Sequence, residues 1–264
     1  MNLDRAVSVV TALPAYTAAV AELPVSAVLT EDLRGAVAVV PGTGDWWQGL
    51  LAARAGGASA VVLADPVVLP RGTIEPERWP GDIPVIVERP RLRPDVVADA
   101  TQARGGSPAR IITVECAAPA AGVAGLIRDG FGWMRCLAGG SLAPQSSLAT
   151  AHSRIALLNS SEYTGGTVPA TLSATALGGP HNGGLLQVLV LGEVRTEVTF
   201  DQPAGLVRVE SFTGEGAFRA PARYESSARL ALRRAIDACL SDRPATELEE
   251  LLQDIALTRA LLDA

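Results

Sequence analysis

The sequence predicts an α/β protein in which a parallel sheet is followed by an α+β domain built on an open, largely antiparallel sheet. Over the first ~105 residues, short apolar runs alternate with helical stretches, a rhythm that implies parallel strands with right-handed crossovers. The later part of the chain instead holds strand-like runs in which apolar and polar residues alternate between glycine-rich turns. With 264 residues, 48% hydrophobic and 19% charged, the chain can bury a sizeable core.

Residues 1–105 form the predicted parallel domain. Four short apolar runs are typical of buried strands: residues 25–29, 36–40, 60–64 and 84–87. Between the second and third runs, Asp45 stands in the first turn of a predicted helix that ends at Gly56 and Gly57. The glycines and proline of residues 103–108 mark the boundary to the next domain.

Residues 106–264 form the predicted α+β domain. A β-branched strand at residues 110–115 precedes a helix at 122–138, and five strand-like runs follow from residue 155 onward. Two helices close the chain, the first at residues 224–240. The second begins near Thr246, which forms a predicted capping box with Glu249 three residues later. We expect one face of this sheet to be solvated or covered by a partner.

The basic residues of the chain are all arginines, and this limits its chemistry. There are 22 basic residues and no lysine. A step that needs a lysine ammonium, as a proton donor or a Schiff base, therefore cannot be performed by this chain alone. The net charge is −6 and the acidic residues are scattered, whereas a nucleic-acid surface needs a basic stripe, so we expect no nucleic-acid partner.

Metal and membrane sites are not expected either. The two histidines, His152 and His181, exclude a histidine-rich metal site, and the three widely spaced cysteines lack any CxxC pattern. The first residues include Asp4 and Pro14 and no long apolar run. No segment stays apolar for the ~20 residues of a membrane span, so we expect a cytoplasmic protein.

Three stretches of the sequence resemble the glucose–fructose oxidoreductase/inositol dehydrogenase/MocA (Gfo/Idh/MocA) family. They are GAVAVVPGTGDWWQGLLAARAGGASAVVLADP, the segment RPRLRPDVVADA leading into RIITVE, and LQVLVLGEVRTEVTFD together with the closing helices. The resemblance implies a Rossmann-like N-terminal domain that binds NAD(P) and a C-terminal α+β domain on an open sheet. It also implies an oxidoreductase activity, which we expect to act on a sugar or polyol.

The glycine pattern departs from that family. Its members open with a strand, a GxGxxG loop and a helix, whose glycines let the backbone approach a pyrophosphate. The first 40 residues contain no such pattern, so we expect the first βα unit to be missing. Gly42 and Gly44 precede a helix and are the candidate cofactor-binding residues, but Trp47 stands where the third glycine would be. The alternative for this pair is a tight strand-to-helix turn.

The lysine signature departs as well. The resemblance implies a catalytic lysine in a Glu-Lys-Pro sequence after a strand. Two tripeptides stand at corresponding places, Ala64-Asp65-Pro66 and Glu88-Arg89-Pro90. Arginine has a pKa above ~12 and is a poor proton donor, and aspartate carries a carboxylate in place of an ammonium. Neither tripeptide therefore preserves the proton-donating role of the lysine.

The candidate catalytic residues are Asp65 and Asp129. The segment 126–137 resembles the family helix that supplies a general acid/base in an Asp-x-x-x-His pattern, but it contains Asp129 and no histidine. If the protein is an enzyme, we expect a pocket where residues 41–45 and Asp65 meet that helix, because ligands bind at the carboxyl ends of strands. Arg89 or Arg91 would hold the substrate there.

Three functions follow from these patterns. The protein is a divergent NAD(P)-dependent oxidoreductase, a non-catalytic module of that fold, or an unrelated α/β protein. We favour the non-catalytic module, which binds a small ligand or pairs with a partner subunit or a second copy through its open sheet. No cofactor is then expected, whereas the oxidoreductase alternative requires NAD(P).

Overall fold

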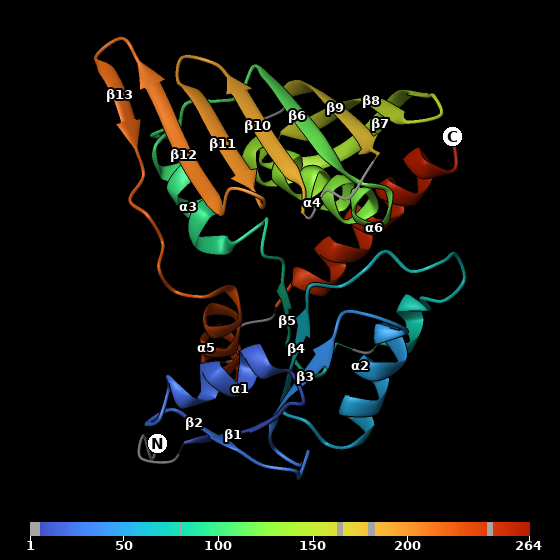
Figure 1. The fold of residues 1–264 in the computed structure, drawn as a ribbon, viewed down its shortest axis with the longest axis vertical. Coiled ribbons are helices and arrows are strands. Elements are labelled where there is room, and N and C mark those ends of the chain that lie inside the picture. The colour runs from blue at the N-terminus through green and yellow to red at the C-terminus, as the bar shows by residue number, and fades with distance from the viewer. Residues whose placement is uncertain (1–5, 80, 163–165, 179–182, 242–244) are drawn as a thin grey trace. The chain divides into compact units, whose positions relative to one another are not determined.

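The computed structural model describes residues 6–79, 81–162, 166–178, 183–241 and 245–264 and divides the chain into two compact units. The first unit comprises Met1–Pro90 and Tyr224–Leu252, and the second comprises Arg91–Arg223 and Gln253–Ala264. Figure 1 shows the elements of both. None of the described helices has both the length and the sustained hydrophobicity that crossing a bilayer requires. The cytoplasmic address stays a prediction.

The first unit is built on a five-stranded parallel sheet with the order β2-β1-β3-β4-β5. Its strands are β1 (Val7–Val10), β2 (Ala27–Leu29), β3 (Val37–Pro41), β4 (Ala60–Ala64) and β5 (Val85–Glu88). Helices α1 (Pro14–Ala21) and α5 (Ser227–Cys239) share a core with one face of the sheet, and α2 (Trp46–Ala55) packs on β3 and β4. Strands β3 and β4 are accordingly apolar along their whole length, as the sequence predicts for a parallel sheet.

The prediction that the first βα unit is missing is wrong, although the fold class is confirmed. The chain opens with a complete unit, β1, α1 and β2, in which Val7 pairs with Ala27 in parallel register. The strand order is that of the standard six-stranded Rossmann sheet, 3-2-1-4-5-6, without its strand 3. Residues 30–36 connect β2 directly to β3. Proline breaks a helix when it lies in the helix interior. Pro14 instead stands at the first helical position of α1, where its missing N–H costs nothing.

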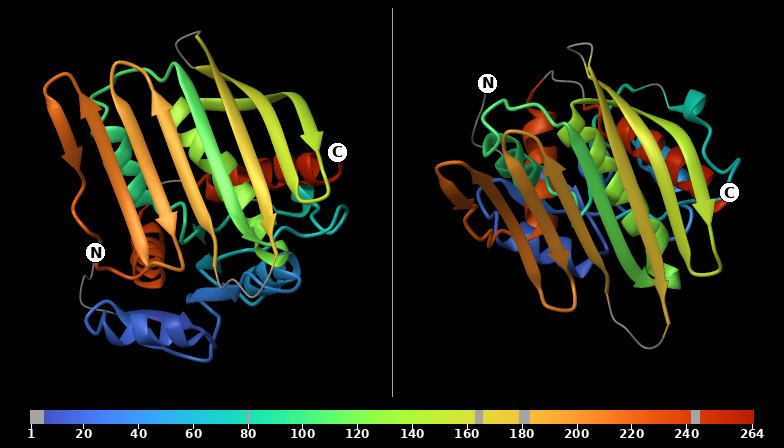
Figure 2. Two further views of the ribbon diagram at one scale, coloured as in Figure 1. Left: turned by 45° about the horizontal axis from the view of Figure 1, so that its top comes forward. Right: turned by 90° about the horizontal axis from the view of Figure 1, so that it is seen from above.

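The second unit is built on an eight-stranded sheet with the order β13-β12-β11-β10-β6-β9-β8-β7. Among the strand pairs that the structure describes in this sheet, only β6 and β9 run parallel, so the prediction of an open, largely antiparallel sheet is confirmed. The strands are β6 (Ile111–Pro119), β7 (Gly140–Ala149), β8 (Ser153–Glu162), β9 (Thr167–Leu177), β10 (Leu185–Leu191), β11 (Arg195–Asp201), β12 (Leu206–Thr213) and β13 (Gly216–Arg219). Figure 2 shows them side by side with the helices of this unit on one face.

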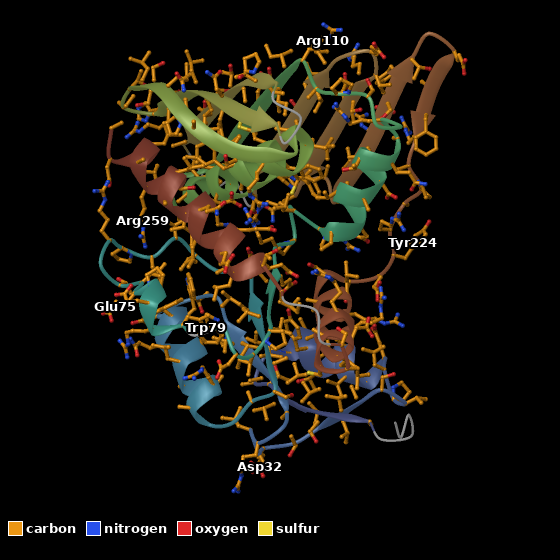
Figure 3. All side chains as sticks on the ribbon, turned by 180° about the vertical axis from the view of Figure 1, so that it is seen from behind. Asp32, Glu75, Trp79, Arg110, Tyr224 and Arg259 are labelled. Carbon is orange, nitrogen blue, oxygen red and sulfur yellow. The ribbon has the colours of Figure 1, made fainter. Side chains whose placement is uncertain are left out.

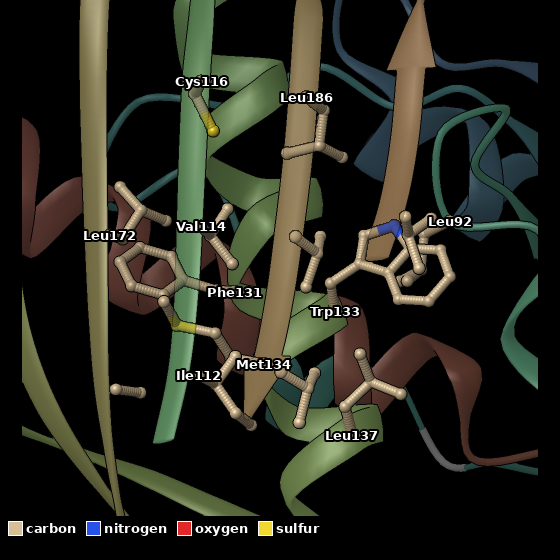
Figure 4. Close-up of a cluster of buried hydrophobic side chains, with 14 of the residues drawn as sticks. Leu92, Ile112, Val114, Cys116, Phe131, Trp133, Met134, Leu137, Leu172 and Leu186 are labelled. Carbon is tan, nitrogen blue, oxygen red and sulfur yellow. The ribbon is translucent and has the colours of Figure 1, made fainter. Parts of the chain in front are cut away.

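Helix α4 (Ala120–Ala138) forms the core of the second unit against that sheet. Figure 4 shows Phe131, Trp133 and Met134 of this helix among side chains of the neighbouring strands. Gly130 allows the close approach, because a Cβ there would come within 3.0 Å of Leu172 and Val114 side-chain carbons. Gly130, which weakens the helix in isolation, therefore serves its packing.

The division between the units differs from the expected boundary after residue 105. Helix α3 (Pro94–Gln102) contributes Val96 and Ala100 to the core of the second unit, so that unit begins at Arg91. Helix α5 contributes Leu232 and Ala235 to the core of the first unit, although it follows the whole second sheet. The last helix, α6 (Glu247–Leu262), is divided at Leu252. Burial of apolar faces, rather than sequence order, sets these assignments.

Candidate functional site

The carboxyl ends of the parallel strands bring several chemically active residues to one edge of the first unit. Strands β3, β4 and β5 end at Pro41, Ala64 and Glu88. Because ligands of open α/β sheets bind at this edge, the loops that follow these strands form the candidate site.

The loop after β1 uses its own backbone donors. The Leu13 N–H donates to Thr11 Oγ1 at 3.1 Å, and Pro14 has no N–H. The amides of Tyr16 and Thr17 both donate to the Leu13 carbonyl at 3.0 Å. At the start of α1, the amides of Leu13 and Tyr16 are therefore bonded locally and Pro14 has none, whereas a helix N-terminus binds anions through free amides.

Gly42 lies where the loops after β3 and β4 cross. Its N–H donates to the Ala64 carbonyl at 2.7 Å, and its carbonyl accepts from Val67 N–H at 2.8 Å. A Cβ at this position would stand 2.1 Å from the Ala64 carbonyl oxygen. Gly44 has a φ of 63°, and Asp45 caps α2 by accepting from the Gln48 N–H. A tight strand-to-helix turn thus accounts for glycine at both positions. Their role in cofactor binding stays a prediction.

Asp65 has a strained backbone. Its φ of 42° is in the left-handed region, and among the described residues no other non-glycine has a positive φ. Its N–H donates to the Glu88 carbonyl at 2.9 Å, which holds it beside the end of β5. Strain of this kind is concentrated at functional sites, and the position agrees with the predicted site, although a catalytic role is untested.

Tyr16 and Glu88 form a buried pair at the same edge. The Tyr16 hydroxyl, on a side chain that is 1% exposed, donates to Glu88 Oε2 at 2.7 Å. Burial raises the pKa of Tyr16 well above its ordinary value, and the negative charges of Glu88 and Asp65 raise it further. Sequence analysis missed this pair, because Tyr16 lies on a helix that it did not predict and 72 residues separate the two.

The predicted residues Arg91 and Asp129 come together in the second unit. Arg91 Nε donates to Asp129 Oδ2 at 2.8 Å, and Arg128 Nε donates to Asp129 Oδ1 at 2.9 Å. Asp129 is fully buried and Arg128 is 1% exposed. A carboxylate held by two guanidiniums is a poor proton carrier, so the geometry favours a structural ion network over the predicted catalytic role.

The remaining singled-out residues are Arg89 and the two histidines. Arg89 follows Glu88 at the end of β5 in the first unit and is buried, with 5% of its surface exposed. His152 is exposed in the turn before β8, and His181 lies outside the described residues. Among the residues that the structure describes, no three His, Cys, Asp or Glu side chains are grouped to hold a metal ion.

Comparisons of the sequence with protein-family models and with curated proteins find no match. Solved structures do match over nearly the whole chain. An oxidoreductase from Sinorhizobium meliloti is 14% identical with a TM-score of 0.63, covering 98% of this chain and 97% of that one. KijD10, a 3-ketoreductase from Actinomadura kijaniata in complex with TDP-benzene and NADP, is 16% identical with a TM-score of 0.62, covering 97% and 96%. The scyllo-inositol dehydrogenase from Lactobacillus casei is 19% identical with a TM-score of 0.58, covering 97% and 87%.

The chain has the fold of the Gfo/Idh/MocA-type oxidoreductases. In a Rossmann sheet, the dinucleotide pyrophosphate rests on the N-terminus of the helix after the first strand. In this chain that position holds Leu13, whose N–H donates to Thr11 Oγ1, and Pro14, which has no N–H. These two residues offer no free amide to a pyrophosphate, and the absence of a cofactor stays a prediction.

We expect Gly42→Ala to destabilise the first unit, because the added Cβ overlaps backbone atoms that cannot rotate away. The cost should be about 3 kcal/mol, in the range of overpacked sites. Urea unfolding monitored by circular dichroism measures it. Gly214→Ala, where a Cβ meets nothing within 4 Å, is the matched control and should change stability by less than about 0.5 kcal/mol. Equal stability of the two variants would contradict the close crossing at Gly42.

The Tyr16–Glu88 pair predicts a loss of stability at alkaline pH. The raised pKa means that folded Tyr16 keeps its proton, while the unfolded chain releases it above the ordinary value of 10.0. The free energy of unfolding should therefore fall above that pH by up to about 1.4 kcal/mol per pH unit, and Tyr16→Phe should lack this term. Urea unfolding from pH 9 to 11 compares the two proteins. Parallel pH profiles would refute the buried, carboxylate-bonded hydroxyl.

Proposed function

We propose that the protein is a non-catalytic module with the Gfo/Idh/MocA fold, which binds a small ligand or pairs with a partner, and that it does not transfer hydride. The start of α1 carries this proposal. A dinucleotide needs free backbone amides and close backbone approach there, and the loop supplies Pro14 and a Leu13 amide already bonded to Thr11.

The missing ammonium supports the same proposal. The chain has no lysine, and the Glu-Arg-Pro sequence after β5 carries a buried guanidinium at Arg89. A guanidinium stays protonated at any physiological pH, so it cannot exchange a proton with a substrate hydroxyl. Arg89 can hold a charge at this position but cannot act as an acid or a base.

A divergent NAD(P)-dependent oxidoreductase acting on a sugar or polyol is the alternative. The strained Asp65 together with Tyr16 and Glu88 favours it, because such groups at the carboxyl edge of a sheet are typical of a working site. The near-complete overlap with KijD10, which was crystallised with NADP, points the same way.

The outer face of the eight-stranded sheet supports pairing with a second copy. Side chains on the face opposite α4 include Leu157, which is 47% exposed, and Ile155 and Leu148, which face each other across β8 and β7. Ile111 and Leu191 pair on the same face across β6 and β10 and are 37% and 40% exposed. Exposed apolar side chains on a sheet face are typical of an interface, and most soluble oligomers consist of identical copies.

We expect neither NADH nor NADPH to stabilise the protein. A ligand at 100 times its dissociation constant adds about 2.7 kcal/mol, which would raise the melting temperature by several degrees in a chain of this size. Thermal unfolding with each cofactor up to millimolar concentration measures the shift, with KijD10 and NADPH as the positive control. A saturable shift would favour the oxidoreductase alternative.

We also expect the double variant Ile155→Glu with Leu157→Glu to abolish self-association. Two carboxylates buried in an apolar interface carry a large desolvation cost. Light scattering after gel filtration should give twice the chain mass of 27.3 kDa for the unaltered protein and one chain mass for the variant. Leu240→Glu, exposed at the end of α5, is the matched control and should leave the mass unchanged. A monomeric unaltered protein would rule out the homo-oligomer.

A further inference from the structure

A second concave site lies within the first unit, at the opposite end of β5 from the candidate site. It is a cavity of about 600 Å³ lined by Pro84 and Val85 at the start of β5, by Trp79 and Asp82 in the preceding loop, and by residues at the end of α5 and the start of α6. Because β5 runs from Val85 to Glu88, the cavity is about 10 Å along the strand from the Tyr16–Glu88 pair. The two sites are therefore separate.

The first turn of α6 is fixed beside this cavity. β5 is an edge strand, and its Val87 N–H donates to Glu247 Oε2 at 3.0 Å, while Arg234 pairs with the same carboxylate. Thr246 Oγ1 donates to Glu250 at 2.9 Å, one residue beyond the predicted capping partner. Glu249 takes part in neither contact, and it lines the cavity.

The lining combines an aromatic ring with negative charge. Trp79, labelled in Figure 3, is half-buried and supplies an indole. Glu249 and Asp82 supply two carboxylates, and bidentate hydrogen bonds from Arg54 keep the pKa of Asp82 below its ordinary value. Val85, Leu248 and Leu252 add apolar surface. The described lining residues include no arginine or histidine.

We propose that this cavity binds a small organic cation that joins an ammonium to an apolar body. An indole face attracts a cation through its quadrupole, and a carboxylate beside it adds charge-assisted hydrogen bonds. The apolar wall takes the hydrocarbon part of the ligand, and the volume is within the range of small-molecule sites. An anionic ligand would meet the Glu249 carboxylate, whereas the charge of Asp82 is already compensated by Arg54. The inference does not depend on whether the carboxyl edge binds a dinucleotide.

Isothermal titration calorimetry of the full chain tests the site with three probes of one shape. 2-Phenylethylamine carries the cation, 2-phenylethanol is its neutral counterpart, and phenylacetate is the anion. We expect saturable binding of the amine, at least tenfold weaker binding of the alcohol, and no binding of the anion. Binding of the alcohol as tight as that of the amine, or no saturable binding of the amine at millimolar concentration, would overturn the proposal.

Variants locate the bound amine. Glu249→Gln should weaken the affinity for the amine about tenfold, because it removes the carboxylate charge. Trp79→Leu should weaken this affinity about fivefold or more, because it removes the cation–π contact. Glu77→Gln, on the exposed turn Pro76–Arg78 and outside the lining, is the control and should leave the affinity unchanged. If Trp79→Leu does not fold, Glu249→Gln still tests whether the cavity binds the amine, because Glu249 is exposed. Unchanged affinity in Glu249→Gln would place the amine elsewhere and refute the site.

Discussion

Burial of the parallel sheet on both faces is the constraint on which the rest of the first unit depends. Helices α1 and α5 share a core with one face, and α2 packs on β3 and β4. Side chains along β3 and β4 are consequently engaged in packing, and the ends of these strands remain for binding. Tyr16, Asp65 and Glu88 lie at the carboxyl end, and the cavity beside Trp79 lies at the amino end of β5.

At the carboxyl edge of the parallel sheet, two backbone amides are bonded within the protein. Buried backbone donors must be satisfied, and here they are satisfied within the protein. Leu13 N–H bonds Thr11, and Gly42 N–H bonds the Ala64 carbonyl. The amides of Leu13 and Gly42 are therefore not free to hold a pyrophosphate, although the sheet has the architecture of a dinucleotide-binding fold. Fold and chemistry are separable for this physical reason.

The second unit distributes its polar groups differently. Its sheet is covered by helices on one face, so alternate residues of each strand lie on an outer face that is free in a single chain. The charged groups of α4 are buried instead of exposed, and Asp129 is held there by Arg91 and Arg128. A buried carboxylate remains ionised only when such partners replace its water.

The sequence by itself determined most strands of the two sheets, because their signals are local, but it missed β1 together with helix α1. β4 is found at its predicted residues, and all five runs expected after residue 155 are strands. A strand buried on both faces is a continuous apolar run, and a strand buried on one face alternates apolar and polar residues, so both can be identified from consecutive residues. The strands it missed in the second unit, β7 and β13, are the two sheet edges, whose polar exposed residues carry no such pattern.

Tertiary structure alone decided the sites and the division between the units. The Tyr16–Glu88 bond joins residues 72 positions apart, and α5 returns to the first unit after the entire second sheet. The role of Gly42 depends on the carbonyl of Ala64 in a neighbouring strand. Contacts of this kind are made by the packing of distant elements, so no periodicity along the chain could specify them.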